Sequence, residues 1–245
     1  MDERTDPPGE PSLLQSWEDL LFLHWELPAA AAARLLPAGL EPDRFEGRTY
    51  AGLVAFSMRR VRPRGLPALP WLSNFLELNV RLYARGPGGR PGVFFLSLDC
   101  DRWPAVALAR SLFHLPYRWA EMDRDRRGGE RGFRCRRRGA GRPAELAWEP
   151  AGEARPAEPG TLEHFLAERY TFFTPGPRGL MAGEVRHAPY AVAPARVRAW
   201  SDLPLRWDGL PDLGAPCHAL ASPGVEVRCW SLADAALRPE GRAVR

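Results

Sequence analysis

Residues 75–83, with the sequence FLELNVRLY, alternate between two kinds of side chain. The even positions are all aliphatic, whereas the odd positions hold Phe75, Glu77, Asn79, Arg81 and Tyr83. Successive side chains of a β-strand point to opposite faces of the sheet. The pattern therefore predicts a strand with one apolar face and one face that carries charged and amide groups between two aromatic rings.

Two interpretations of the polar face are open. In the first, the strand is half exposed, and Glu77 and Arg81 form a weak ion pair in solvent. In the second, this face lines the inside of a closed or cone-shaped sheet, where charges beside aromatic rings form a ligand cavity. We favour the second, because a solvated face has little need for both Phe75 and Tyr83.

The rest of the chain predicts more strands than helices. Short helices are expected at 28–36, 104–113 and 161–170, with Asp101 placed to cap the second. The Gly- and Pro-rich stretch at 85–92 predicts a hairpin connection, and many other loops are too short for parallel crossovers. Further strands are expected at 49–58, 74–84, 92–98, 118–122, 132–137, 145–148, 170–174, 180–186 and 225–231. The predicted fold class is α+β, mainly antiparallel β, with a sheet that is curved or closed.

The length of 245 residues suits one large domain. We expect a single folded domain at 13–233, a disordered Pro-rich and acidic tail at 1–12, and a C-terminal tail at 234–245. No apolar run is long enough for a membrane helix, and the N-terminus lacks the basic-then-apolar pattern of a secretory signal. We therefore expect a cytoplasmic protein without a membrane partner. Assembly into a homo-oligomer is left open.

The net charge of +4 is concentrated in one segment. Residues 123–142 contain nine Arg and three acidic residues, so the remainder of the chain is slightly acidic. The Gly pairs in this segment favour a solvated hairpin with charged faces. We expect no nucleic-acid partner, because the aromatic rings that stack on bases are absent and no helix-turn-helix or zinc-finger pattern accompanies the charges.

The composition also bears on catalysis. The sequence contains no lysine, so no side chain offers an ε-amine that could form an imine with a carbonyl substrate. The four cysteines form no CxxC pair, so we predict neither a metal site nor a cofactor. His24 and Trp25 lie in an otherwise apolar run, and we interpret them as core residues.

Several blocks of sequence resemble the YqjF-like proteins, a bacterial family without an established function. The blocks are SWEDLLFLHWELP (16–28), FLELNVRLYARGPGGRPGVFFLSLD (75–99), ALARSLFHLPYRWAEM (107–122), FLAERYTFF (165–173) and HAPY (187–190). The resemblance spans residues 16–231. It implies the acetoacetate-decarboxylase-like fold, a mostly antiparallel cone-like β-barrel with a flanking sheet and a few helices around a central cavity.

The sequence also resembles, more faintly, acetoacetate decarboxylase itself. In that enzyme an aromatic-Pro-Lys-Lys turn follows a Gly-Arg-Glu motif; its first lysine forms the imine, and the second lowers the pKa of that amine. The matching residues here are Ala-Arg-Ser at 109–111 and then Leu-Pro-Tyr-Arg at 115–118. Tyr117 thus stands where the imine-forming lysine would be, and Arg118 where its partner would be. Glu77 resembles the active-site glutamate. We therefore do not expect a Schiff-base decarboxylase.

Three hypotheses follow for the site. The favoured one is a binding pocket in which Arg81, Arg110 and Arg118 hold a small organic acid, because guanidinium groups pair with carboxylates through two hydrogen bonds. The second is a cofactor-free lyase or hydrolase for a keto acid or lactone, with Glu77 as general acid or base and Tyr117 as proton donor. The third is a closed salt-bridge network that only stabilises the fold.

Five more residues complete the predicted ligand-binding set. They are Asn79, Phe75 and Tyr83 from the alternating strand, Tyr170 from the end of the third helix, and His187 from the HAPY block. For His187, the competing interpretation is a structural role in which its ring forms a hydrogen bond within the fold. For Tyr170, the competing interpretation is a position at the end of the third helix, outside the cavity.

Overall fold

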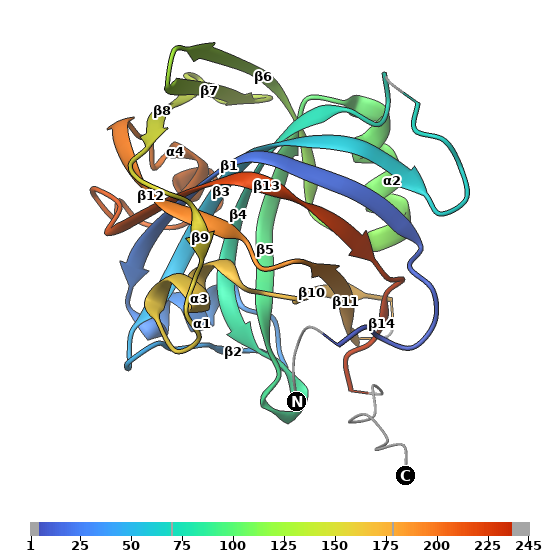
Figure 1. The fold of residues 1–245 in the computed structure, drawn as a ribbon. Helices are drawn as coiled ribbons and strands as arrows, with labels where there is room; N and C mark the ends of the chain where they lie inside the picture. The colour runs from blue at the N-terminus through green and yellow to red at the C-terminus, as the bar shows by residue number, and fades with distance from the viewer. Residues whose placement is uncertain (1–4, 70, 178, 237–245) are drawn as a thin grey trace.

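A computed structural model of the chain describes residues 5–69, 71–177 and 179–236 (Figure 1). In these residues, fourteen strands form one sheet, and short helices lie against it. The helices are α1 (Ala29–Leu35), α2 (Trp103–Phe113), α3 (Leu162–Ala167), α4 (Leu203–Trp207) and the 3-10 helix η1 (Pro87–Gly89). The strands are β1 (Leu13–Leu27), β2 (Glu41–Pro42), β3 (Thr49–Pro63), β4 (Phe75–Arg85), β5 (Pro91–Cys100), β6 (Tyr117–Arg127), β7 (Glu130–Arg137), β8 (Ala144–Pro150), β9 (Arg155–Pro156), β10 (Thr171–Gly176), β11 (Gly179–His187), β12 (Ala191–Ala199), β13 (His218–Cys229) and β14 (Ala233–Asp234).

The strand pairings return on themselves in two circuits. The first runs β4–β5–β10–β11–β13–β1–β3 and back to β4. The second leaves β5 through β6, β7, β8 and β12 and rejoins at β13. The pairs β5–β6 and β5–β10 are parallel, whereas the other pairs are antiparallel. The sheet is therefore mixed rather than a clean antiparallel barrel, although the prediction of a mainly antiparallel sheet is correct.

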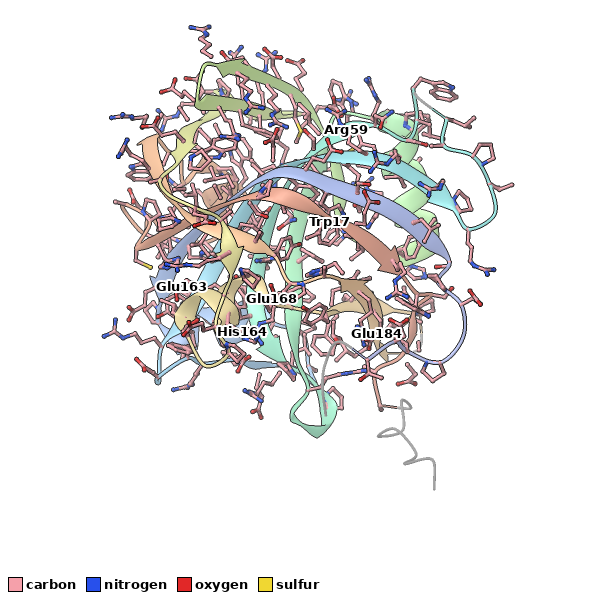
Figure 2. The ribbon with its side chains drawn as sticks, viewed as in Figure 1. Trp17, Arg59, Glu163, His164, Glu168 and Glu184 are labelled. Carbon is pink, nitrogen blue, oxygen red and sulfur yellow. The ribbon has the colours of Figure 1, made fainter. Side chains whose placement is uncertain are left out.

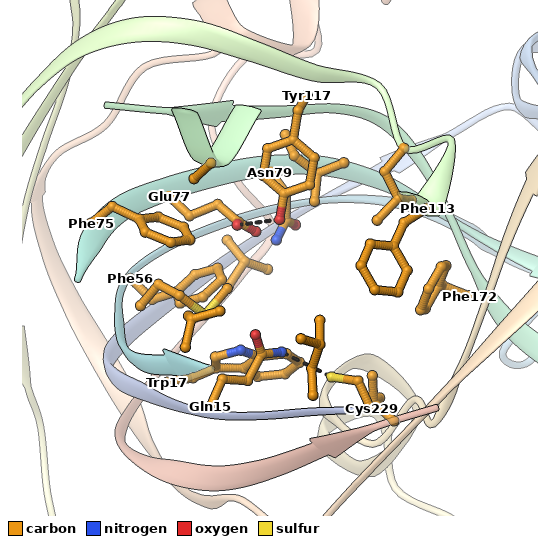
Figure 3. Close-up of a pocket in the computed structure, with 18 of the residues that line it drawn as sticks. Gln15, Trp17, Phe56, Phe75, Glu77, Asn79, Phe113, Tyr117, Phe172 and Cys229 are labelled. Atoms are coloured by element: carbon orange, nitrogen blue, oxygen red, sulfur yellow. Dashed lines mark hydrogen bonds between the residues drawn. The ribbon is translucent and has the colours of Figure 1, made fainter. Parts of the chain in front are cut away.

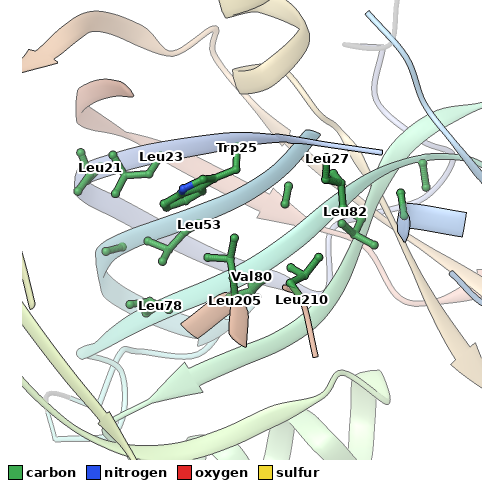
Figure 4. Packing of buried hydrophobic residues seen from close by; sticks show 14 of the residues in the cluster. Leu21, Leu23, Trp25, Leu27, Leu53, Leu78, Val80, Leu82, Leu205 and Leu210 are labelled. Atoms are coloured by element: carbon green, nitrogen blue, oxygen red, sulfur yellow. The ribbon is translucent and has the colours of Figure 1, made fainter. Parts of the chain in front are cut away.

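Strand β4 shows the predicted alternation and belongs to both circuits. Its even face is a dry core, in which Leu78, Val80 and Leu82 pack with β1, β3 and α4 (Figure 4). Each of these side chains is fully buried and contributes about 2 kcal/mol to folding. Its odd face is buried as well, with Glu77 and Arg81 only 2% and 8% exposed. The half-exposed interpretation of the strand is therefore wrong.

The structure contains strands that the sequence patterns do not predict. The largest is β1, which lies between β13 and β3. Residues 20–25 of β1 are buried on both faces, so the segment is apolar except for His24 and shows no alternation. His24 and Trp25 lie within this run, as the core interpretation predicts. Strand β12 and helix α4 are also missing from the sequence prediction.

Other elements differ in detail. Helix α3 covers only Leu162–Ala167, and β13 begins seven residues before the predicted strand at 225–231. Asp101 does not cap α2, because its Oδ1 accepts a hydrogen bond from the backbone N–H of Leu76 in β4 at 2.9 Å, and the residue at the N-cap is Arg102. The predicted hairpin at 85–92 is confirmed, since β4 and β5 pair antiparallel across it.

The Arg-rich segment forms the antiparallel hairpin β6–β7, as predicted. Three of its arginines are largely buried: Arg124 and Arg131, which both pair with Asp19 of β1, and Arg137. Arg137 is buried and donates to Asp99 at 2.8 and 2.9 Å and to Asp208 at 2.7 Å, so it joins β7 to β5 and to the end of α4. These ionic hydrogen bonds connect two strands of the second circuit with the end of α4.

The extent of the domain stays a prediction. Residues 5–12 form neither helix nor strand, yet Arg228 pairs with Asp6 at 2.6 Å and Arg186 donates to the carbonyl of Thr5 at 2.8 Å. Of the predicted C-terminal tail, residues 237–245 lie outside the described residues, and Asp234 belongs to β14. No helix in the described part of the chain combines the length and the apolar character needed to cross a membrane.

Candidate functional site

A cavity of about 400 Å³ lies against the odd-numbered face of β4, within the first circuit of strands (Figure 3). Its walls are mostly aliphatic and aromatic side chains from β1, β3, β4 and β5, together with residues from α2, β13 and the segment after α3. Leu66 and Leu69 of the β3–β4 connection also line it and are 58% and 48% exposed, so this connection marks the mouth. Such a volume suits a small organic ligand.

Glu77, Asn79 and Tyr117 meet at one wall of the cavity (Figure 3). The hydroxyl of Tyr117 donates to Glu77 Oε2 at 2.8 Å. Burial deprives the Glu77 carboxylate of water and raises its pKa from 4.5 to about 7, although hydrogen bonds from Tyr117 and Asn79 work in the opposite direction. Burial also raises the pKa of Tyr117 well above its ordinary value, so this phenol stays protonated at neutral pH.

Arg81 lies at another part of the wall and has no acidic partner. Its Nη2 donates to the carbonyl of Leu166 at 2.9 Å and to the hydroxyl of Tyr83 at 3.1 Å. No carboxylate of the described residues lies within 4.0 Å of its guanidinium. The nearby His24 does not add a second positive charge, because burial and Arg81 itself lower the pKa of the imidazole well below its ordinary value and keep it neutral. By contrast, the other buried cation of the lining, Arg169, pairs with Asp43 at 3.1 Å.

Three polar atoms in the cavity wall lack a hydrogen-bond partner among the described residues. They are the acceptor Asn79 Oδ1 and the donors Arg81 Nε and Trp17 Nε1. Buried polar atoms are nearly always hydrogen-bonded, since leaving one unpaired costs free energy. These three atoms have almost no accessible surface, so they are unpaired inside the protein and do not open onto the cavity.

The structure brings together only part of the predicted set. Phe75, Glu77, Asn79, Arg81 and Tyr117 all line the cavity. Tyr83 lies behind the lining, where its hydroxyl donates to the carbonyl of Leu166 at 2.7 Å and contacts His24 at 2.8 Å.

Arg110 and Arg118, both predicted to bind a ligand, lie outside the cavity lining and are exposed. Arg110 instead donates through Nε to the backbone carbonyl of Tyr117 at 2.6 Å. Arg118 follows Tyr117 in β6, and neighbouring side chains of a strand point to opposite faces. Once Tyr117 faces the cavity, Arg118 faces away from it.

Tyr170 and His187 also lie outside the lining. The hydroxyl of Tyr170 donates to Glu168, at the C-terminal end of α3 (Figure 2). His187 contacts the carbonyl of Ala188 through Nδ1 at 2.8 Å, which agrees with its structural interpretation. The centroid of its ring lies 4.5 Å from the centroid of the Tyr190 ring, and Tyr190 lines the cavity.

Several lining residues are absent from the sequence prediction. Trp17 of β1 stacks against Tyr190. It lines the cavity (Figure 3). Gln15 and Cys229 lie on neighbouring strands of the same wall and are joined by a 3.0 Å hydrogen bond. Trp17 and Arg169 lie in the sequence blocks that carry the family resemblance. Their position in these blocks is the one signal in the sequence that could have indicated them as cavity residues. Within the described ranges, no three His, Cys, Asp or Glu side chains form a group able to hold a metal ion.

Comparisons with known proteins place this geometry in context. Residues 14–226 match the family DUF2071, described as an uncharacterized conserved protein. The chain is 33% identical over 187 residues to the uncharacterized protein YqjF of Bacillus subtilis (strain 168), which covers 76% of this chain and 77% of that protein.

Solved structures show a similar fold. Acetoacetate decarboxylase from Legionella pneumophila subsp. pneumophila str. Philadelphia 1 superposes with a TM-score of 0.65 at 11% identity and covers 97% of this chain and 96% of its own. The enduracididine biosynthesis enzyme MppR complexed with pyruvate superposes with a TM-score of 0.58 at 16% identity, over 91% of this chain and 89% of its own. At these identities the likeness is one of fold, and it confirms the predicted acetoacetate-decarboxylase-like architecture.

Proposed function

Given that the chain belongs to the uncharacterized DUF2071 family, we propose a function from the site itself: the cavity beside β4 binds a small carboxylate-bearing molecule. The family assignment supplies no activity, so the proposal rests on the chemistry of the wall. The sequence contains no lysine, and by the resemblance to acetoacetate decarboxylase Tyr117 stands where the imine-forming lysine would be. A Schiff-base decarboxylase is therefore not the function that we propose.

The observation that carries the proposal is the unpaired charge of Arg81. Arg81 is buried, with only 8% of the residue exposed. It lines the cavity without a carboxylate partner in the described residues. An uncompensated buried ion costs several kcal/mol, and a guanidinium pairs well with a carboxylate. A ligand carboxylate at Arg81 would remove this cost. The pyruvate held by MppR is a carboxylate in a protein of the same fold, which supports this class of ligand.

A thermal-shift experiment tests the proposal. At pH 7, the protein is mixed with acetate, hexanoate, decanoate or benzoate, and we expect at least one of them to raise the melting temperature. A ligand at a hundred times its Kd stabilises the native state by about 2.7 kcal/mol. Arg81→Met should abolish the shift, whereas the matched control Arg136→Met should keep it, because Arg136 is exposed and pairs with Glu121 on the hairpin. The proposal fails if no acid shifts the transition, or if the shift survives in Arg81→Met.

A second candidate function is acid–base catalysis without a cofactor. It is favoured by the contact between Glu77, whose pKa is about 7, and the neutral phenol of Tyr117. A group with a pKa near the working pH serves well as a general acid or base. Turnover of an enolisable keto acid or a lactone should then fall at least a hundredfold in Glu77→Gln while the fold is retained. Equal turnover by Glu77→Gln and the wild-type protein would rule this candidate out.

The third hypothesis, a closed network of Glu77 with the arginines, lacks the contacts that it requires. Glu77 bonds to Tyr117, and Arg81 bonds to Leu166 and Tyr83. No ion pair joins Glu77 to Arg81 within the residues that the structure describes.

A further inference from the structure

Exposed apolar side chains gather around the mouth of the cavity. Among the described residues five large apolar side chains are exposed, and four of them lie on two segments. Leu66, Leu69 and Trp71 belong to the β3–β4 connection, and Trp103 begins α2. The two indole-bearing residues are 65% and 67% exposed. Large apolar groups clustered in water mark an interaction site, and we call these four residues the mouth surface.

The two segments border the same opening. The exposed leucines of the connection line the cavity, and so does Ala105 of α2. Asp101, two residues before Trp103, accepts a hydrogen bond from the backbone N–H of Leu76 at 2.9 Å. This bond fixes the start of α2 beside the end of the connection, where β4 begins. Figure 1 shows the connection and α2 on the same side of the sheet.

The surroundings of the mouth surface are basic. Residues 59–74 contain four arginines and no acidic residue. Three of these arginines pair with exposed glutamates of other segments, and ion pairs in solvent are weak and easily exchanged. The fourth, Arg62, lines the mouth, and Arg102 precedes Trp103 in an exposed position. Neither forms an ion pair with another described residue, so both charges are available to a negatively charged surface.

Exposed tryptophan beside arginine is the combination that suits the surface of a membrane. Indole rings favour the headgroup level of a bilayer, and guanidinium groups attract anionic lipids. A protein binds there when apolar side chains enter the boundary and basic ones stay at the headgroups. From these observations we propose that the mouth surface docks on an anionic lipid bilayer, with the mouth of the cavity facing the membrane.

This contact is peripheral. The expectation of no membrane partner came from the lack of a spanning segment, and a surface-bound protein needs none. The inference also goes beyond the carboxylate-binding function, because docking requires no bound ligand. Its consequence for that function is a route of entry: an acid with an apolar chain, dissolved in the bilayer, would reach the cavity without crossing water.

Co-sedimentation with vesicles tests the proposal on the unliganded protein. One set of vesicles is phosphatidylcholine, and the other holds equal parts of phosphatidylcholine and phosphatidylglycerol. We expect binding to the anionic vesicles at about 0.1 M salt, and at least tenfold weaker binding to phosphatidylcholine alone. Binding should also weaken at least tenfold at about 1 M salt, where the Debye length falls from about 10 to about 3 Å.

Matched variants locate the contact. Trp71→Ser should weaken binding at least tenfold, because it removes a large apolar group from the boundary. Its control is Trp200→Ser, since Trp200 is also exposed but follows β12, away from both segments. Arg102→Gln should weaken binding about fivefold. The control Arg34→Gln changes an exposed arginine of α1, which lies at the opposite end of the β1–β3 pair, and should have no effect.

The outcomes separate docking from ligand binding. The proposal is overturned if the wild-type protein ignores the anionic vesicles, binds both sets equally, or binds as well after Trp71→Ser. It is also overturned if light scattering without lipid shows a dimer that Trp71→Ser dissociates, because the surface then joins two copies of the chain. The lipid and salt dependence of the wild-type protein tests the proposal even if a variant fails to fold. A carboxylate-induced thermal shift that depends on Arg81 stands or falls independently of every one of these results.

Discussion

Replacing Glu77 with glutamine should make the protein more stable at pH 8. The reason is the cost of ionising this carboxyl inside the cavity wall, where burial raises its pKa from 4.5 to about 7. Below pH 4.5 the carboxyl is protonated in both the folded and the unfolded chain, so ionisation costs nothing. Between pH 4.5 and 7 the unfolded chain releases the proton while the folded chain keeps it, and the stability of the wild-type protein falls with rising pH.

The size of this effect follows from the shift in pKa. Each pH unit between the two pKa values is worth 1.36 kcal/mol, so the loss above pH 7 is about 3 kcal/mol. A glutamine side chain has the same shape, does not ionise, and still accepts the hydrogen bond of Tyr117. Glu77→Gln should therefore match the wild-type protein at pH 4 and exceed its free energy of unfolding by about 3 kcal/mol at pH 8.

Urea unfolding at pH 4, 5, 6, 7 and 8 measures this difference, and contributions from other titrating groups cancel between the two proteins. The matched control is Glu184→Gln, since Glu184 is also buried but pairs with Arg90 and Arg186, each at 2.7 Å. That variant should lose on the order of 3 kcal/mol at pH 8, because it removes the charge that pairs with the buried Arg186 and the partly buried Arg90. A loss of stability in Glu77→Gln at pH 8, or a difference from wild type that does not vary with pH, would refute the reasoning.

Three further predictions follow from the same contacts. Tyr117→Phe removes a hydrogen bond that favours the ionised form of Glu77, so the pKa of Glu77 should rise above 7. The infrared band of the Glu77 carboxyl group, followed as a function of pH, measures this pKa. A pKa equal to that of the wild-type protein would contradict the prediction. Arg137→Ala leaves two buried aspartates unpaired and should lower the free energy of unfolding by about 3–5 kcal/mol in urea. Arg136, which neighbours Arg137 in β7, forms an exposed ion pair with Glu121 of β6, and Arg136→Ala should cost less than about 1 kcal/mol. Equal losses in the two arginine variants would disprove the distinction.

The agreement between sequence and structure is best at β4. Strict alternation over nine residues has few explanations, because the side chains of a strand must point alternately to its two faces. The aromatic residues at both ends of the polar face indicated burial, and the structure places that face on a cavity. The hairpin after β4 was equally predictable, since Gly and Pro restrict the chain to a turn there.

The errors have physical causes of their own. Strand β1 is buried on both faces, and a segment of this kind carries no periodicity. The chemistry of the side chains predicts both Tyr117 and Arg118 in the site, although adjacent residues of a strand cannot both face one cavity. Trp17 and Cys229 escaped prediction because they come from strands at opposite ends of the chain, which pair along their length in the folded protein.

The amino-acid sequence is thus enough to establish a two-faced strand, a β-rich domain and the absence of a lysine ε-amine for imine chemistry, because these depend on neighbouring residues or on composition. The cavity itself depends on the folded chain. Whether the polar face of β4 meets water is set by the circuit of pairings through β5, β10, β11, β13, β1 and β3. Those pairings join residues far apart in the chain, and they leave Arg81 buried without a carboxylate, which no local pattern reveals.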